Sequence, residues 1–171
     1  MFKMINSTDE MILIAAGSSL PFNHIDSQQI VLRAYSALGR VAALKKVSPL
    51  YESPAWPDPC DPPFINAVAV IETEMDAEAL LVALHTIEAG FGRRRGARNA
   101  PRTLDLDLLA YGRECREETA GLQLPHPRMQ DREFVLAPLC DLAPDWRHPT
   151  LGKTTAQMLS TLPARTARKI E

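Results

Sequence analysis

Two carboxylates two residues apart, Asp105 and Asp107, lie in an otherwise apolar run over residues 104–109. In a β-strand this spacing places both acids on one face and the leucines between and around them on the other. Carboxylates that face the same way in a largely buried strand repel each other and are costly to desolvate, and a bound Mg²⁺ removes both problems. The pair therefore predicts a magnesium site.

Five arginines stand directly before this pair, in a stretch that also contains glycines: Arg93, Arg94, Arg95, Arg98 and Arg102. Guanidinium groups donate forked hydrogen bonds that match phosphate oxygens, and a glycine-bearing loop can close over a bound nucleotide. Acids that hold a cation beside dense arginine suit a polyphosphate substrate, and no GxxxxGK[ST] phosphate loop occurs in the sequence. The pattern indicates phosphoryl-type transfer without a Walker fold.

Bulk composition is that of a globular protein: 171 residues, 46% hydrophobic and 23% charged, with a net charge of −2. We expect one domain over residues 1–171, with residues 1–10 as a loose extension. The charge argues against a nucleic-acid partner, and no apolar run is long enough to span a membrane. Three scattered cysteines, an odd number, predict reduced thiols and a cytoplasmic location.

The hydrophobic pattern predicts an α+β chain. Strands are expected over residues 11–16, 45–53, 64–73 and 104–111, and helices over 26–39, 76–91, 131–142 and 154–162. Pro49 suggests an edge or a bulge in the second strand, and five prolines make residues 54–63 a loop. The order βαββαβ is that of a ferredoxin-like unit, an antiparallel sheet with helices packed on one face, here followed by C-terminal helical segments.

Two further constellations carry polar or aromatic groups. His126 stands between two prolines with Arg128 and Arg132 nearby, a fixed setting that fits a phosphate or nucleotide contact, although a lone histidine is more often structural. Trp56, Phe64 and Asn66 can sandwich and hydrogen-bond a flat heterocycle. Core packing of Phe64 and surface exposure of Trp56 explain that set equally well.

Five stretches together carry a resemblance to a known family. The most specific is residues 99–109, with its Pro-Arg-x-x-Asp-x-Asp spacing, and the others are residues 16–20, 51–54, 64–67 and 125–134. They resemble, in order over roughly residues 11–146, the 6-hydroxymethyl-7,8-dihydropterin pyrophosphokinases of folate biosynthesis. The resemblance implies a ferredoxin-like fold and a reaction in which ATP and the hydroxymethyl dihydropterin give AMP and the pterin diphosphate.

The resemblance also implies residue roles. Asp105 and Asp107 would bind two Mg²⁺ ions, and the catalytic set would be Arg93, Arg102 and Asp107. ATP would be contacted by Glu88, Arg95, Arg98, Arg102, His126 and Arg132, and the pterin by Ser53, Pro54, Trp56, Phe64, Asn66 and Phe134. Either aspartate can take the proton of the attacking hydroxyl. A monomer is expected.

This chain departs from the family pattern at Asn99-Ala100, where many members carry Trp-Gly, so that a tryptophan is missing from the loop, for which Trp56 could compensate. Two other interpretations compete. An RNA-binding ferredoxin-like domain is disfavoured because the sequence lacks the K/R-G-F/Y-type aromatic motif. A catalytically silent homologue is disfavoured by the intact Asp105, Asp107, Arg102 and His126.

Overall fold

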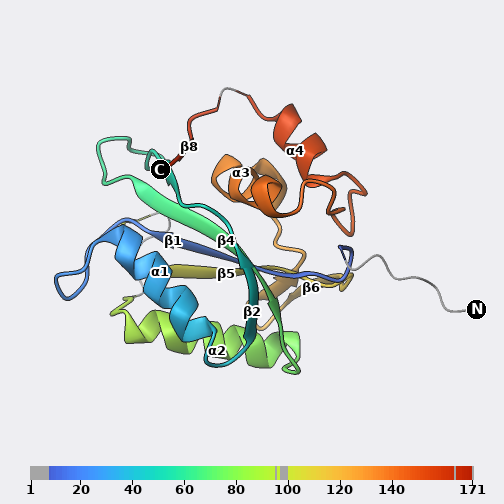
Figure 1. Cartoon of the computed structure of the whole chain (residues 1–171), viewed down its shortest axis with the longest axis horizontal. Coiled ribbons are helices and arrows are strands. Elements are labelled where there is room, and N and C mark those ends of the chain that lie inside the picture. The colour runs from blue at the N-terminus through green and yellow to red at the C-terminus, as the bar shows by residue number, and fades with distance from the viewer. Residues whose placement is uncertain (1–7, 95, 97–99, 164, 171) are drawn as a thin grey trace, which may run out of the picture.

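The computed structural model describes residues 8–94, 96, 100–163 and 165–170. Its centre is a sheet in which all strand pairs are antiparallel, with the order β5-β1-β4-β3-β8 and with β2 also paired to β4 (Figure 1). The strands are β1 (Ile12–Ser18), β2 (Ala43–Val47), β3 (Tyr51–Ser53), β4 (Phe64–Glu72), β5 (Asp105–Tyr111) and β8 (Arg168–Lys169). The central order β5-β1-β4-β2/β3 is that of a ferredoxin-like sheet and confirms the predicted fold class.

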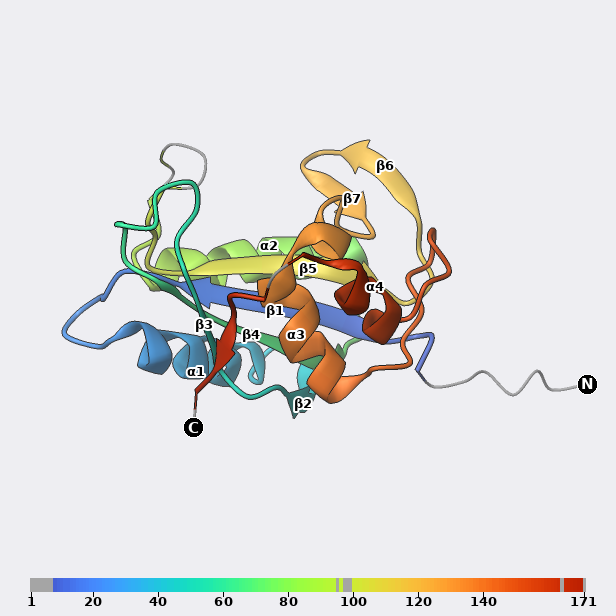
Figure 2. The same cartoon turned by 90° about the horizontal axis from the view of Figure 1, so that it is seen from above.

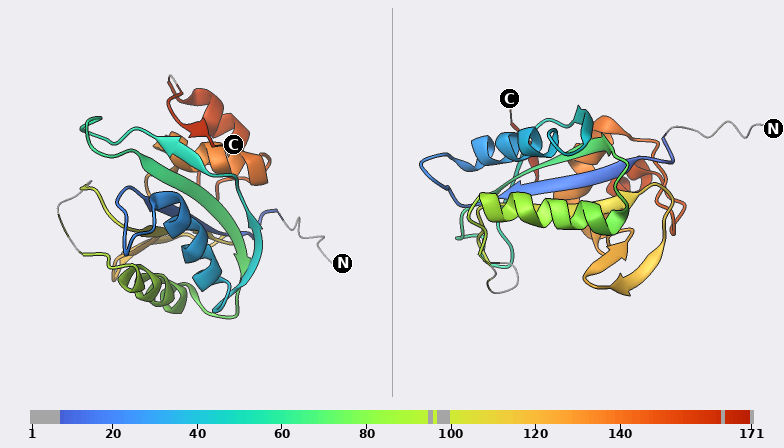
Figure 3. Two further views of the ribbon diagram at one scale, coloured as in Figure 1. Left: turned by 60° about the vertical axis from the view of Figure 1, so that its left-hand side comes forward. Right: turned by 90° about the horizontal axis from the view of Figure 1, so that it is seen from below.

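Helices cover both faces of the sheet. One face packs against α1 (Ser27–Leu38) and α2 (Ala77–Gly90), and the other packs against α3 (Glu133–Leu142) and α4 (Thr155–Thr161) (Figures 2 and 3). The prediction of helices on one face only was therefore incomplete. Alternate residues of the central strands explain the difference, because Ile14 belongs to the first apolar core and Leu13 to the second.

Side-chain caps fix where the helices begin. Asp26 accepts the backbone N–H of Gln29 at 2.9 Å, and Asp76 accepts that of Ala79 at 2.8 Å. Thr154 forms a reciprocal capping box at the start of α4. These bonds satisfy donors that the first helical turn leaves free, and they confirm three predicted helix starts.

The predicted strand over residues 45–53 is divided into β2 and β3 at Ser48 and Pro49. Proline has no N–H for the ladder, and the Ser48 hydroxyl accepts the backbone N–H of Val68 at 3.0 Å in place of a backbone partner. The structure adds elements that the sequence did not predict: the hairpin β6 (Arg116–Thr119) and β7 (Leu122–Leu124), the 3₁₀ turn η1 (Met129–Asp131), and β8.

In the described part of the chain, no helix combines the length and the apolar character needed to cross a membrane.

Candidate active site

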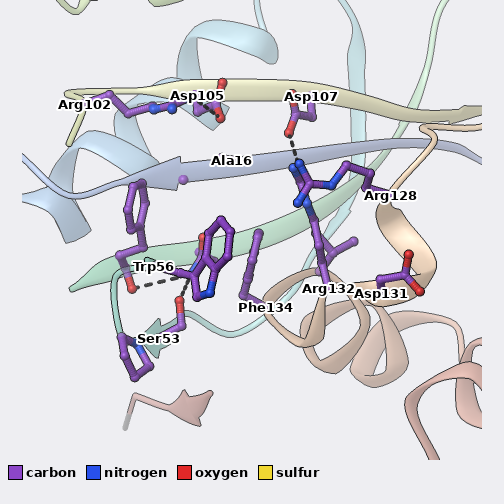
Figure 4. A pocket seen from close by; sticks show the side chains of 16 residues that line it. Ala16, Ser53, Trp56, Arg102, Asp105, Asp107, Arg128, Asp131, Arg132 and Phe134 are labelled. Carbon is purple, nitrogen blue, oxygen red and sulfur yellow. Dashed lines mark hydrogen bonds and ion pairs between the residues drawn. The ribbon is translucent and has the colours of Figure 1, made fainter. Parts of the chain in front are cut away.

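A cavity of about 340 Å³ lies on the α3 side of the sheet, where β1, β4 and β5 face the first turn of α3 (Figure 4). It brings together most of the predicted site residues: Ser53, Pro54, Trp56, Phe64, Asn66, Arg102, Asp105, Asp107, Arg132 and Phe134. Glu88, Arg93 and His126 stand outside its lining. Arg95 and Arg98 lie outside the described residues.

Strand register explains why residues so far apart in sequence meet here. Gly17 of β1 lies opposite Asn66 of β4 on one side and opposite Asp105 of β5 on the other. Ala15 lies opposite Asp107, so both acids point to the α3 face while Leu104, Leu106 and Leu108 enter the core beneath α1 and α2. The predicted division of faces is thereby confirmed.

Gly17 is required by the close approach of a neighbour. A Cβ atom at this position would lie 3.1 Å from Oδ1 of Asn66 and 3.8 Å from the ring of Phe64. The bare backbone of Gly17 therefore leaves room for the amide of Asn66 over the sheet.

At the acidic end of the cavity, arginines hold both carboxylates. Asp105 accepts hydrogen bonds from Nη1 of Arg93 and, at 3.0 Å, from Nη1 of Arg102. Asp107 lies 3.6 Å from Nη1 of Arg132, which reaches across from the start of α3 (Figure 4). Each acid thus has its own cationic partner, although both remain partly exposed to the cavity.

Burial raises the pKa of Asp107 from 3.8 to about 7, the charge of Asp105 adds to the rise, and Arg132 opposes it. Burial, together with repulsion by the charge of Asp105, therefore favours a proton on Asp107 near neutral pH. A divalent cation relieves the same repulsion.

His126 lies beside this pair, with Nε2 4.0 Å from a carboxylate oxygen of Asp107. Its Nδ1 accepts the backbone N–H of Arg128 at 3.2 Å, so in the neutral ring the proton is on Nε2 and faces Asp107. Burial, together with the positive charge of Arg132, lowers the pKa of His126 from 6.5 to about 4. At neutral pH His126 is an uncharged hydrogen-bond donor.

Glu88 is buried behind the acidic strand, away from the cavity. Its Oε1 accepts the backbone N–H of Leu106 at 2.7 Å and Nη1 of Arg93 at 3.1 Å, and the same nitrogen of Arg93 donates to the carbonyl of Leu104. Burial raises the pKa of Glu88, and the bond from Leu106 opposes the rise. Glu88 thus fixes Arg93 and β5 to α2, while the ATP contact expected for it stays a prediction.

At the other end, polar and aromatic groups surround a flat space. Nδ2 of Asn66 donates to the hydroxyl of Ser53 at 2.8 Å, which fixes the amide orientation and directs Oδ1 of Asn66 over Gly17. Phe64, Phe134 and Trp56 line the same end, and Trp56 is 67% exposed. Arg132 lies 5.6 Å from the ring centre of Phe134 and so connects the two ends of the cavity.

Several lining residues were not singled out as site residues. Arg128 and Asp131 stand on the exposed turn before α3, and Ala15, Ala16 and Val135 form part of the floor and wall. Arg128 had a signal, since it stands in the same Pro-flanked block as His126. Ala15 had none, because only the register shows that it lies beside Asp107, whereas Ala16 belongs to the stretch 16–20 that resembles the family.

Within the described residues, no three His, Cys, Asp or Glu side chains cluster as a closed metal site. The pair Asp105 and Asp107 nevertheless fits Mg²⁺, which commonly takes one or two carboxylates and completes its shell with substrate phosphates and water. The fit rests on two carboxylates that face one cavity and on the raised pKa of Asp107.

Known proteins resemble this chain over most of its length. Residues 13–144 match the family model described as 7,8-dihydro-6-hydroxymethylpterin-pyrophosphokinase. A 2-amino-4-hydroxy-6-hydroxymethyldihydropteridine pyrophosphokinase of Pseudomonas aeruginosa is 40% identical over 90% of this chain and 93% of its own length. The enzyme of that name from Synechocystis is 42% identical over 74% of this chain and 65% of its own length.

Longer proteins also match. The folic acid synthesis protein FOL1 of Dictyostelium discoideum is 34% identical over 92% of this chain, which spans 23% of that relative. The crystal structure of wild-type Plasmodium falciparum HPPK-DHPS superposes on 88% of this chain and 44% of its own length, with a TM-score of 0.65 and 12% identity, and so shows the same fold.

Proposed function

Because this chain belongs to the 7,8-dihydro-6-hydroxymethylpterin-pyrophosphokinase family, we propose that it transfers diphosphate from ATP to 6-hydroxymethyl-7,8-dihydropterin. The observation that carries this proposal is the two-ended cavity. One end holds paired carboxylates among arginines, and the other holds aromatic rings around a fixed amide. The arrangement suits a triphosphate beside a flat polar heterocycle.

At the acidic end, Asp105 and Asp107 would hold two Mg²⁺ ions. Bound there, the metal would supply charge neutralisation on the triphosphate. Arg102 and Arg132 are each paired with one of the acids and would exchange these carboxylates for phosphate oxygens. By family resemblance the ATP-binding set is Glu88, Arg95, Arg98, Arg102, His126 and Arg132.

At the other end, Phe64 and Phe134 would stack on the two sides of the pterin ring, with Trp56 as a movable cover. Oδ1 of Asn66, directed over Gly17, accepts a hydrogen bond from the polar edge of the ring, and Ser53 keeps the amide in that orientation. Pro54 closes the wall beside them.

The chemistry is an in-line displacement. The hydroxymethyl oxygen attacks the β-phosphorus, the bond between that phosphorus and the α,β-bridging oxygen breaks, and AMP leaves with the electron pair. The hydroxyl proton passes to one of the two facing carboxylates, Asp105 or Asp107. Arg93 and Arg102 stabilise charge that develops at the phosphates, which makes them, with Asp107, the proposed catalytic set.

We further propose a single monomeric domain that works in the cytoplasm, without nucleic-acid or membrane partners. Three free cysteines support a reducing compartment, because two of them, Cys60 and Cys115, are exposed on the surface.

The decisive experiment mixes purified protein with Mg²⁺, ATP and the hydroxymethyl dihydropterin and measures AMP and ADP separately. AMP that forms only with the pterin supports the proposal, whereas ADP would indicate an ordinary kinase. Asp107→Asn serves as the inactive control. Absence of any nucleotide product from folded wild-type protein would contradict the proposed activity and favour a silent homologue.

A further inference from the structure

The segment 165–170 joins two elements that form the pterin end of the cavity. It runs past the start of α3 and ends in β8, which lies beside β3 in Figure 2. α3 carries Phe134 and β3 carries Ser53, so this segment lies behind both walls of the proposed ring-binding space.

Its attachment to α3 depends on one carboxylate. Oε2 of Glu133 accepts the backbone N–H of Thr166 at 2.7 Å, the hydroxyl of Thr166 at 3.2 Å and the backbone N–H of Ala167 at 3.1 Å. Glu133 is the first residue of α3 and stands between Arg132 and Phe134, both of which line the cavity. Any shift of Glu133 therefore moves the neighbouring cavity residues.

Its attachment to β3 is a short antiparallel ladder with one ion pair. Lys169 lies opposite Tyr51 and Arg168 opposite Glu52, and Nη2 of Arg168 lies 2.7 Å from a carboxylate oxygen of Glu52. The backbone N–H of Ile170 donates to the carbonyl of Leu50 at 2.9 Å.

A second link returns from this ladder to α3. Asp141 accepts the phenol of Tyr51 at 2.6 Å and lies 3.0 Å from Nζ of Lys169. Tyr51 lies opposite Asn66 in the sheet, so the link ends at the residue that would read the ring edge. The segment 165–170 is thus bonded to β3 and to both ends of α3, at Glu133 and at Asp141.

We propose that Glu133 is a positioning residue for the pterin: by holding the segment 165–170 against α3, it sets the separation of the Phe134 and Ser53 walls. The inference rests on the proposed function for the identity of the ring. ATP would be affected less, because Arg132 alone among its proposed contacts adjoins Glu133, and the others come from α2, the arginine-rich loop and the Pro-flanked His126.

The test compares Glu133→Ala, Glu133→Gln and the matched control Glu118→Ala, an exposed residue of β6 outside the cavity lining. KM is measured for each substrate with the other saturating. We expect Glu133→Ala to raise the KM for the pterin about 5- to 10-fold, because hydrogen bonds to a charged acceptor are lost. Both kcat and the KM for ATP should stay within about twofold of wild type. Glu133→Gln keeps an acceptor oxygen and should restore most of the pterin affinity.

Deletion of residues 163–171 offers a second test that leaves Glu133 and α3 intact, and it should reproduce the effect of Glu133→Ala on the pterin alone. An unchanged pterin KM in both variants, or a proportional loss of kcat and of affinity for both substrates, would overturn the positioning role. A wild-type protein that forms no AMP would instead contradict the proposed function, so the two failures are distinguishable.

Discussion

Arg93 and Glu88 form an ion pair of 3.1 Å behind the acidic strand, and the same nitrogen of Arg93 donates to Asp105. The first arginine of the arginine-rich loop is therefore fixed at both its helix and its strand before any substrate binds. This arrangement assigns Glu88 a definite structural task, even though it does not line the cavity.

Glu88→Ala should lower both stability and turnover. Its loss leaves the buried backbone N–H of Leu106 without an acceptor, at a cost of about 1–3 kcal/mol in the free energy of unfolding, and leaves Arg93 held only by Leu104 and Asp105. Urea denaturation and steady-state kinetics measure the two effects. Glu78→Ala is the matched control, because Glu78 belongs to the same helix and pairs with Arg116 away from the cavity. Equal kcat values for the two variants would contradict the role of Glu88.

Asp107→Asn should abolish turnover and yet stabilise the metal-free fold at high pH. The pKa of Asp107 is raised from 3.8 to about 7, so the native state binds the extra proton and wild-type stability falls as pH rises through that window. Asp107→Asn removes the ionisable group, so the stability of the variant does not fall in this way. The free energy of unfolding of the variant should equal that of wild type below about pH 4. Above pH 7 it should exceed the wild-type value by about 1–2 kcal/mol, allowing for an Asp107 side chain that is 30% exposed.

The measurement is thermal or urea unfolding of both proteins with EDTA at several pH values. Parallel curves with no pH-dependent gap would show that Asp107 is ionised in the native state well below neutrality.

Gly17→Ala should weaken pterin binding selectively. The new Cβ would lie 3.1 Å from Oδ1 of Asn66, which must then shift by a few tenths of an ångström and lose its alignment with the ring edge. A loss of about tenfold in pterin affinity is expected, with ATP binding unchanged. Fluorescence titration of the pterin gives the affinity. Gly90→Ala is the control, because a Cβ there meets nothing within 4 Å; equal pterin affinities for the two variants would argue against the steric role of Gly17.

His126 should remain neutral until the pH falls to about 4, since burial and Arg132 lower its pKa from 6.5. Native stability that depends on His126 is therefore complete above pH 6.5 and decreases as the pH falls toward 4. NMR titration of the ring in the substrate-free protein measures the value directly. Arg132→Ala should restore the pKa of His126 only in part, because burial is the larger cause of its lowering. A midpoint near 6.5 in wild type would contradict the lowering of the His126 pKa by burial and Arg132.

Much of the fold could be predicted because helix caps, hydrophobic periodicity and turn residues indicated the same elements. Asp26, Asp76 and Thr154 cap the helices that they were expected to start, and Leu104 to Leu108 alternate with the acids as a half-buried strand requires. β6, β7 and β8 escaped prediction because each is only two to four residues long and β6 and β8 are strongly charged. Their formation depends on tertiary contacts, such as the pairing of Arg168 with Glu52.

Site residues could be predicted from the sequence where the type of side chain indicates its chemistry. They could not be predicted where their position depends on strand register. The residue types and spacing of Asp105, Asp107 and Arg102 predicted a site, and all three line the cavity. The placement of Gly17 between Asn66 and Asp105 follows from pairing across three strands, which one sequence does not display. The bonds of Glu133 to residues 166–167 join segments more than 30 positions apart and left no local pattern.

The position of β5 at the border of the sheet has a consequence for behaviour at high protein concentration. A border strand exposes unpaired backbone groups that can recruit a strand from another molecule. Here Glu88 accepts the N–H of Leu106, and the N–H of His126 donates to the carbonyl of Leu109 at 2.8 Å. Groups that arrange the reaction centre therefore also shield this border against self-association, so that damage to one of them endangers solubility as well as catalysis.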